Sequence, residues 1–123
     1  MSISRLPDSE LQVMQAIWAC TPPVTRKSIE AQLSKTYPIA QTTLLTLLTR
    51  LKEKGFVSVT QGGKARLYTP LISQQDYLSQ QCSSFIKRLC GGSISTFASA
   101  LCDSDLTEQE LSELSRLLER GEL

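Results

Sequence analysis

The chain of 123 residues contains no histidine. This removes the commonest general base of enzymes and the commonest metal ligand. The cysteines form no C-x-C or C-x-x-C pair, so the sequence offers no clustered thiolates for zinc. Glycine-rich phosphate loops and nucleophile motifs are also missing. We therefore expect a protein that has no metal, no cofactor and no enzymatic activity.

The sequence also lacks a long apolar run. No stretch approaches the roughly 20 residues that a membrane-spanning helix needs, so we expect no direct association with a membrane. Residues 1–5 do not form the apolar centre of a signal peptide, which predicts a cytoplasmic protein. In that compartment the cysteines are expected to be reduced, small and buried apolar residues: Cys20, Cys82, Cys90 and Cys102.

The net charge of +1 conceals an asymmetry. Up to Ile72 the chain has nine Lys or Arg and four Asp or Glu; from Ser73 it has four Lys or Arg and eight Asp or Glu. A basic first part and an acidic second part suggest that only the first part meets a polyanion, although a chance drift of charge is an alternative.

Residues 38–55 carry the most informative pattern in the chain. Leucines at positions 44, 47, 48 and 51 have the i, i+3, i+4, i+7 spacing of one apolar helix face. Another face has short hydrogen-bonding side chains and little charge, whereas a solvated face normally carries Glu and Lys. Such a face suits the donors, acceptors and thymine methyl groups of the DNA major groove. The alternative is a surface helix that happens to be rich in threonine.

This helix supplies most of the predicted DNA contacts. Base contacts are expected from Gln41, Thr42, Leu45 and Thr46. Contacts with phosphates, or a role in holding the helix in place, are expected from Thr43, Thr49 and Arg50. An ion pair with a nearby acid is an alternative for Arg50.

The surrounding segments predict a winged helix-turn-helix domain. Helices are expected over residues 8–19 and 26–35, with Thr25 as N-cap of the second. Gly55 ends the third helix. Residues 56–60 and 65–69 alternate like strands around a turn at 61–64, so a β-hairpin follows. Lys64 and Arg66 near its tip are expected to contact phosphates, with protection of an edge strand as the alternative.

The chain changes character after Ile72. Helices are expected at residues 74–89, near 94–101 and from Thr107, whose spacing to Glu110 forms a capping box. About fifty residues cannot bury all their apolar side chains alone, so a second copy of this segment is the expected partner. Folding back onto the first domain is the alternative. The predicted dimerisation residues are Leu78, Cys82, Phe85, Ile86, Leu89, Phe97, Leu101, Leu111, Leu114 and Leu118.

These elements predict a mainly α protein with a small β-hairpin, an α+β fold. Residues 1–72 would form the DNA-binding domain, and residues 73–123 would form a helical dimerisation domain.

Several segments, in order, resemble the BlaI/MecI-type repressors, to which the CopY branch is related. Residues 11–18 resemble the family's first-helix motif, residues 43–51 its recognition helix, 66–70 its wing ending, 89–92 its Gly-Gly elbow and 106–118 its closing helix. The resemblance implies a homodimeric repressor of transcription that binds a palindromic operator in double-stranded DNA. In the β-lactam branch it also implies a membrane sensor-protease that leads to cleavage of the repressor.

The chain differs from this family in three respects. Ala100 and Leu101 stand where the β-lactam repressors have a scissile Asn–Phe bond, so they mark the corresponding cleavage position. The paired cysteine ligands of the CopY branch are missing. Leu45 replaces a residue that is often basic, which would change the operator preference through thymine methyl contacts.

Two other function classes remain open from the sequence. A winged helix can bind proteins and no nucleic acid, and the modest charge of residues 1–72 is compatible with this. A repressor can also sense a small molecule or cysteine oxidation in place of proteolysis.

Overall fold

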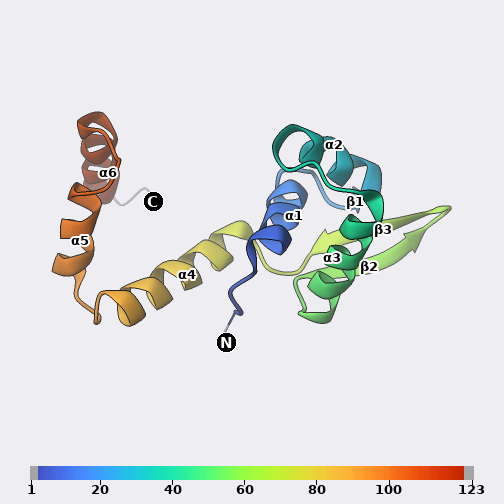
Figure 1. The fold of residues 1–123 in the computed structure, drawn as a ribbon, viewed down its shortest axis with the longest axis horizontal. Coiled ribbons are helices and arrows are strands. Elements are labelled where there is room, and N and C mark those ends of the chain that lie inside the picture. The colour runs from blue at the N-terminus through green and yellow to red at the C-terminus, as the bar shows by residue number, and fades with distance from the viewer. Residues whose placement is uncertain (1–2, 121–123) are drawn as a thin grey trace. The chain divides into compact units, whose positions relative to one another are not determined.

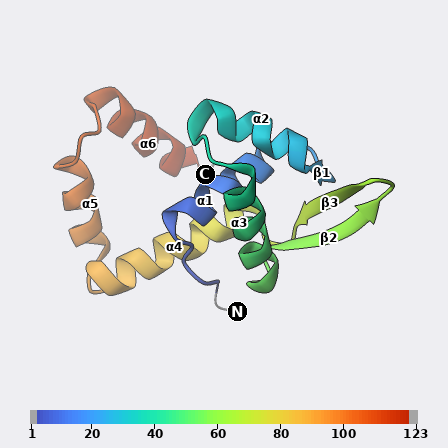
Figure 2. The ribbon, with the colours of Figure 1, turned by 45° about the vertical axis from the view of Figure 1, so that its right-hand side comes forward.

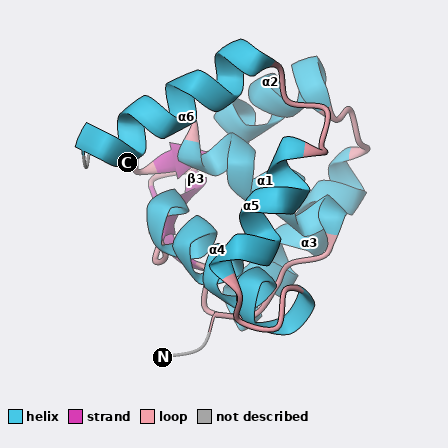
Figure 3. Cartoon of the chain, turned by 90° about the vertical axis from the view of Figure 1, so that its left-hand side faces the viewer, coloured by secondary structure: helices cyan, strands magenta, loops and turns pink. Residues whose placement is uncertain are grey.

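The computed structural model describes residues 3–120 and contains six helices and three strands within them. The chain divides into a unit that ends at Gln81 and a unit that begins at Cys82. We call these the N-terminal and C-terminal units and describe each by itself. In the described residues, all strands belong to the N-terminal unit, and the C-terminal unit consists of helices and loops (Figure 3).

The N-terminal unit is a winged helix-turn-helix fold, as the sequence predicts. It contains α1 (Asp8–Trp18), α2 (Arg26–Thr36) and α3 (Gln41–Glu53), followed by the hairpin of β2 (Val57–Gly62) and β3 (Ala65–Pro70) (Figure 1). The Thr25 hydroxyl accepts a hydrogen bond from the Ser28 amide at 3.2 Å, which confirms it as the N-cap of α2. Gly55 follows α3 with φ of +81°, a conformation that favours glycine.

The strands form one antiparallel sheet in the order β1-β3-β2. Strand β1 (Val24–Thr25) was not predicted, because two residues are too short to show an alternating pattern. Val24 pairs with Tyr68 and Thr25 with Leu67. The hairpin is tighter than expected: Gly62 pairs with Ala65, so only two residues connect the strands.

The core of the N-terminal unit joins all three helices to the sheet. The fully buried side chains include Met14 and Ile17 of α1, Ile29 of α2 and Phe56, which precedes β2. One charged group is buried with them: the Glu10 carboxylate, 2.5 Å from Nζ of Lys54 at the end of α3. This ion pair joins the first turn of α1 to the residue that follows α3, because a buried carboxylate needs a partner for its charge.

Helix α4 (Gln74–Leu89) has the bounds that the sequence predicts, and its first turns belong to the N-terminal unit. Tyr77, in the first turn of α4, is buried in the core of the N-terminal unit. Its hydroxyl accepts a hydrogen bond from the Leu6 amide at 2.9 Å, and its ring lies 5.8 Å from the rings of Trp18 and Phe56. The compact unit thus extends beyond Ile72, and a functional division at residues 72 and 73 stays a prediction.

The C-terminal unit contains the end of α4, α5 (Ile94–Cys102) and α6 (Glu108–Arg120). The capping box is confirmed: the Thr107 amide donates to Oε1 of Glu110 at 2.9 Å, and the Glu110 amide donates to the Thr107 hydroxyl at 3.1 Å. Gly91 and Gly92 have positive φ and end α4. The Phe85 and Phe97 rings pack edge to face at 6.0 Å.

Within the single chain none of the four cysteines is fully buried, so the expected burial is not found there; burial of Cys82 in a dimer stays a prediction. Cys20 and Cys90 are partly buried, whereas Cys82 and Cys102 are exposed, and all four are free thiols. For Cys82, Cys90 and Cys102, the reason is that no side chain in the described part of the C-terminal unit is buried. A sequence pattern identifies an apolar face but does not show whether the same chain covers it.

Replacement of Tyr77 by alanine tests whether the N-terminal unit includes the start of α4. We expect Tyr77→Ala to lower the free energy of unfolding by about 3 kcal/mol or more, because it leaves a cavity in the core and an unpaired Leu6 amide. Urea unfolding followed by the fluorescence of Trp18 measures it. Gln75→Ala is the control and should change the free energy of unfolding by less than about 1 kcal/mol, since Gln75 is an exposed residue of the same helix outside the predicted dimer interface. If both variants lowered the free energy of unfolding equally, the start of α4 would not belong to the N-terminal unit.

Candidate nucleic-acid interface

The two faces of α3 have opposite environments, which is what the sequence predicts. The leucines at positions 44, 47, 48 and 51 are 0–4% exposed and form part of the core. The predicted DNA-contacting residues of α3 lie outside the core. Leu45 is partly buried, and the others are exposed: Gln41, Thr42, Thr43, Thr46, Thr49 and Arg50. The leucine face therefore holds the helix and leaves the polar face free.

Two threonines of the polar face hydrogen-bond to their own helix. The Thr46 hydroxyl donates to the Thr42 carbonyl at 3.1 Å, and the Thr49 hydroxyl donates to the Leu45 carbonyl at 2.9 Å. In this arrangement each side chain presents a methyl group and an oxygen whose two lone pairs can accept. A methyl group suits a thymine methyl, and an acceptor suits the amino group of cytosine or adenine.

A basic groove lies between α3, the start of α2 and the hairpin. Its volume is about 800 Å³, and four cations line it: Arg26, Lys27, Lys64 and Arg66. The other lining residues are Thr25, Leu45, Gln61, Ala65 and Tyr68. Among residues 3–120, no acidic side chain lines this groove, so its walls are positive and suited to a polyanion such as a phosphate backbone.

A second hollow runs along the other side of Leu45. It is lined by Thr49 and Lys52 of α3 and by residues of the hairpin, and it shares Leu45, Gln61, Arg66 and Tyr68 with the basic groove. The two hollows thus meet at Leu45 of α3 and at the hairpin. Lys52 is a further cation beside the exposed face of α3, and it is not among the residues that the sequence predicts to contact DNA.

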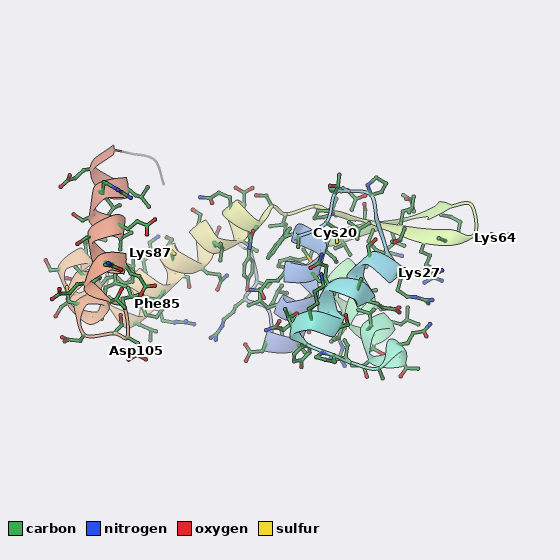
Figure 4. All side chains as sticks on the ribbon, turned by 90° about the horizontal axis from the view of Figure 1, so that it is seen from above. Cys20, Lys27, Lys64, Phe85, Lys87 and Asp105 are labelled. Carbon is green, nitrogen blue, oxygen red and sulfur yellow. The ribbon has the colours of Figure 1, made fainter. Side chains whose placement is uncertain are left out.

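The hairpin extends beyond the helices of the N-terminal unit (Figure 2). Lys64 lies at its tip, and Lys27 lies on α2 (Figure 4). Lys64 and Arg66 are exposed and belong to neither of the two ion pairs found among residues 3–120. Their charges are therefore available for phosphates.

Arg50 is also exposed and pairs with no acid within the described part of the chain. The alternative of an internal ion pair is therefore not what the structure contains. Arg50 stays a candidate for a phosphate contact.

Sequence reasoning missed Arg26 and Lys27 because it considered α2 only as a support for α3. A signal was present. Two cations in the first turn of a helix oppose the helix dipole; Arg26 is offset by an ion pair with Glu30 one turn later, whereas helix stability gives no reason for Lys27. An anionic ligand gives a reason, because such cations and the free amide groups of a helix N-terminus attract a phosphate together.

The predicted dimerisation residues all lie outside the protein core of the single chain. Leu78 is 48% exposed, Leu89 is 62% exposed and Leu118 is 59% exposed. The rest are exposed or partly buried: Cys82, Phe85, Ile86, Phe97, Leu101, Leu111 and Leu114. The single chain therefore leaves its tail helices with uncovered apolar surface.

Ala100 and Leu101, at the expected cleavage position, lie within α5. Ala100 is exposed and Leu101 is partly buried. Proteolytic cleavage prefers exposed irregular segments, so cleavage of this bond would require α5 to unwind. Separately, no helix in residues 3–120 has the length and apolar character that crossing a bilayer demands.

Comparison with known proteins identifies the family. The family model of the penicillinase repressor matches residues 6–120. The chain belongs to this family. It is 33% identical to the penicillinase repressor of Bacillus licheniformis over 118 residues, which cover 95% of this chain and 91% of that protein. It is 26% identical to the methicillin resistance regulatory protein MecI of Staphylococcus aureus, over 94% of each chain. Members of the family are repressors and not enzymes.

Solved structures agree with the fold of the N-terminal unit. The solution structure of the DNA-binding domain of the repressor BlaI matches with a TM-score of 0.53 and 35% identity, over 63% of this chain and 94% of that domain. A monomeric form of BlaI from Bacillus licheniformis, in complex with the blaP half-operator, matches with a TM-score of 0.52 and 34% identity, over 62% of this chain and 92% of that chain. The resemblance inferred from the sequence motifs is therefore confirmed.

The salt dependence of DNA binding tests the role of the hairpin cations. We expect Lys64→Ala combined with Arg66→Ala to reduce the slope of log K against log salt by about 2, because each lost phosphate contact removes about one released counterion. Fluorescence anisotropy with a labelled duplex at several salt concentrations measures the slope. The control is Lys35→Ala combined with Lys87→Ala, which removes two exposed cations outside the groove and should leave the slope unchanged. An unchanged slope in the hairpin variant would exclude the phosphate contacts.

Proposed function

We propose that this protein is a homodimeric repressor of transcription that binds a palindromic operator through two copies of the N-terminal unit. The observation that carries the proposal is the exposed polar face of α3, bordered by a groove with four cations and no acid. In this proposal α3 enters the major groove. Gln41, Thr42, Leu45 and Thr46 contact bases, while Thr43, Thr49, Arg50, Lys64 and Arg66 contact phosphates or position the helix.

The known relatives support the DNA partner. A monomeric form of BlaI has been solved in complex with a half-operator, and its sequence is 34% identical to this chain over 62% of it. A half-operator implies a second half in the complete operator. A dimer with two-fold symmetry would match two inverted half-sites.

The uncovered apolar surface of the tail supports a second copy as partner. Phe85, Leu89, Ile94 and Leu118 are each at least 40% exposed in the single chain. Exposed apolar side chains gathered on a few helices are typical of an interface, and a two-fold interface needs only one self-complementary surface. Dimerisation would also raise operator affinity, since the second half-site is bound at a high effective concentration.

Release by a membrane sensor-protease is the least supported part of the family resemblance. The bond at Ala100–Leu101 differs from the Asn–Phe bond of the β-lactam repressors and lies within a helix. We therefore propose operator binding as the function and assign the chain no cleavage step. As an operator-binding repressor, it would act in the cytoplasm.

A charge placed on the apolar side of α4 tests the dimer and the operator together. Leu89→Glu should raise the dissociation constant of the dimer by about 100-fold or more, because symmetry places the buried charge twice in one interface. Sedimentation equilibrium measures it. Ser83→Glu is the control, since Ser83 is an exposed residue of the same helix away from the apolar side.

The same variant should lose affinity for the duplex that the wild-type chain selects from a randomised library. Its affinity for a single half-site should stay unchanged, because the N-terminal unit is not altered. A wild-type chain that is monomeric at micromolar concentration, or that selects no sequence, would contradict the proposed function.

A further inference from the structure

Arg26 contacts Gln41, the residue at the start of α3 that is predicted to contact a base. Arg26 is the first residue of α2, and Gln41 is the first residue of α3. The Gln41 amide is oriented with its oxygen toward Arg26, since the opposite orientation would turn its N–H groups toward the guanidinium donors. In this orientation the oxygen accepts from Nη1 of Arg26 at 3.0 Å and from Nη2 at 3.2 Å.

Glu30 holds the guanidinium from the other side. Nε of Arg26 lies 3.3 Å from Oε1 of Glu30, one turn further along α2, and both atoms are closed off from solvent. The ion pair at Nε has no hydrogen bond, so the two hydrogen bonds from the terminal nitrogens to Gln41 are what orient the planar guanidinium. Contacts between the side chains of Glu30, Arg26 and Gln41 thus connect α2 to α3.

This arrangement decides which hydrogen bonds Gln41 can offer. A glutamine that reads adenine uses both ends of its amide: the oxygen accepts from N6 and the nitrogen donates to N7. Here the oxygen is turned toward Arg26 and accepts from both of its terminal nitrogens, so the two N–H donors are the groups that Gln41 presents on its other side. Guanine presents two acceptors, O6 and N7, at the same edge.

We infer that Arg26 is a specificity-determining residue, which holds Gln41 as a pure donor and so selects guanine over adenine at one position of each half-site. Arg26 acts through Gln41 and is a positioning residue. The inference rests on the proposed function, since it requires α3 to enter the major groove. The position of Gln41 agrees with this, because the N-terminal residues of a recognition helix reach the base edges.

Selection from a randomised duplex library with the full chain tests the inference. The wild type should prefer guanine to adenine by about tenfold or more at one position of each half-site. Gln41→Ala should erase the preference at that position. Arg26→Lys keeps the charge but loses the planar fork, so adenine should become accepted to within about threefold of guanine at the same position. The double variant should behave like Gln41→Ala alone.

Lys27→Gln is the matched control. It removes the neighbouring cation of the same groove, and it should weaken binding to all sequences equally while the guanine preference stays. Urea unfolding followed by Trp18 fluorescence should show that each variant is folded.

Three outcomes would overturn the inference while the proposed function stands. The guanine preference could survive Arg26→Lys, the wild type could select adenine at the Gln41-dependent position, or Arg26→Lys could weaken all sequences equally, as a plain phosphate contact would. A wild-type chain that selects no sequence would overturn the proposed function and this inference together.

Discussion

The burial of one face of α3 is the constraint on which the rest of the structure depends. Four leucines of this face belong to the core, and each contributes roughly 2 kcal/mol by leaving water. Threonine costs a helix only about 0.6 kcal/mol per residue relative to alanine. The leucine face therefore outweighs the unfavourable helix propensity of the opposite face, and that face can carry side chains chosen for contacts outside the fold. The ion pair of the buried Glu10 carboxylate with the exposed Lys54 adds a directional contact between α1 and the end of α3.

The outward face of the N-terminal unit separates two tasks. The cations stand around α3, on the first turn of α2 and on the hairpin, while the face of α3 itself has short polar and methyl-bearing side chains. Cations provide affinity that does not depend on sequence, and the short side chains can distinguish base edges. The C-terminal unit is acidic and leaves apolar surface uncovered, so it suits contact with a second copy better than contact with DNA.

Local sequence patterns were sufficient for α3, the presence of the hairpin, the capping box at Thr107 and the bounds of α4. Each of these depends on spacing or on turn chemistry within a few residues. They were insufficient where distant segments meet. The two-residue strand β1 exists only because β3 lies beside it, and Tyr77 is buried because its hydroxyl and ring meet Leu6, Trp18 and Phe56. The contact of Arg26 with Gln41 joins two helix starts, and no pattern within either helix predicts it.

The most direct test of the account is whether α3 distinguishes bases. The measurement is the affinity of Thr46→Ala for the duplex that the wild type selects and for random duplex of equal length, at one salt concentration. Alanine favours the helix more than threonine does, so the fold should persist. The account predicts about tenfold weaker binding to the selected duplex, as expected for one lost base contact, and unchanged binding to random duplex. An equal loss on both duplexes, or no loss on either, would contradict it.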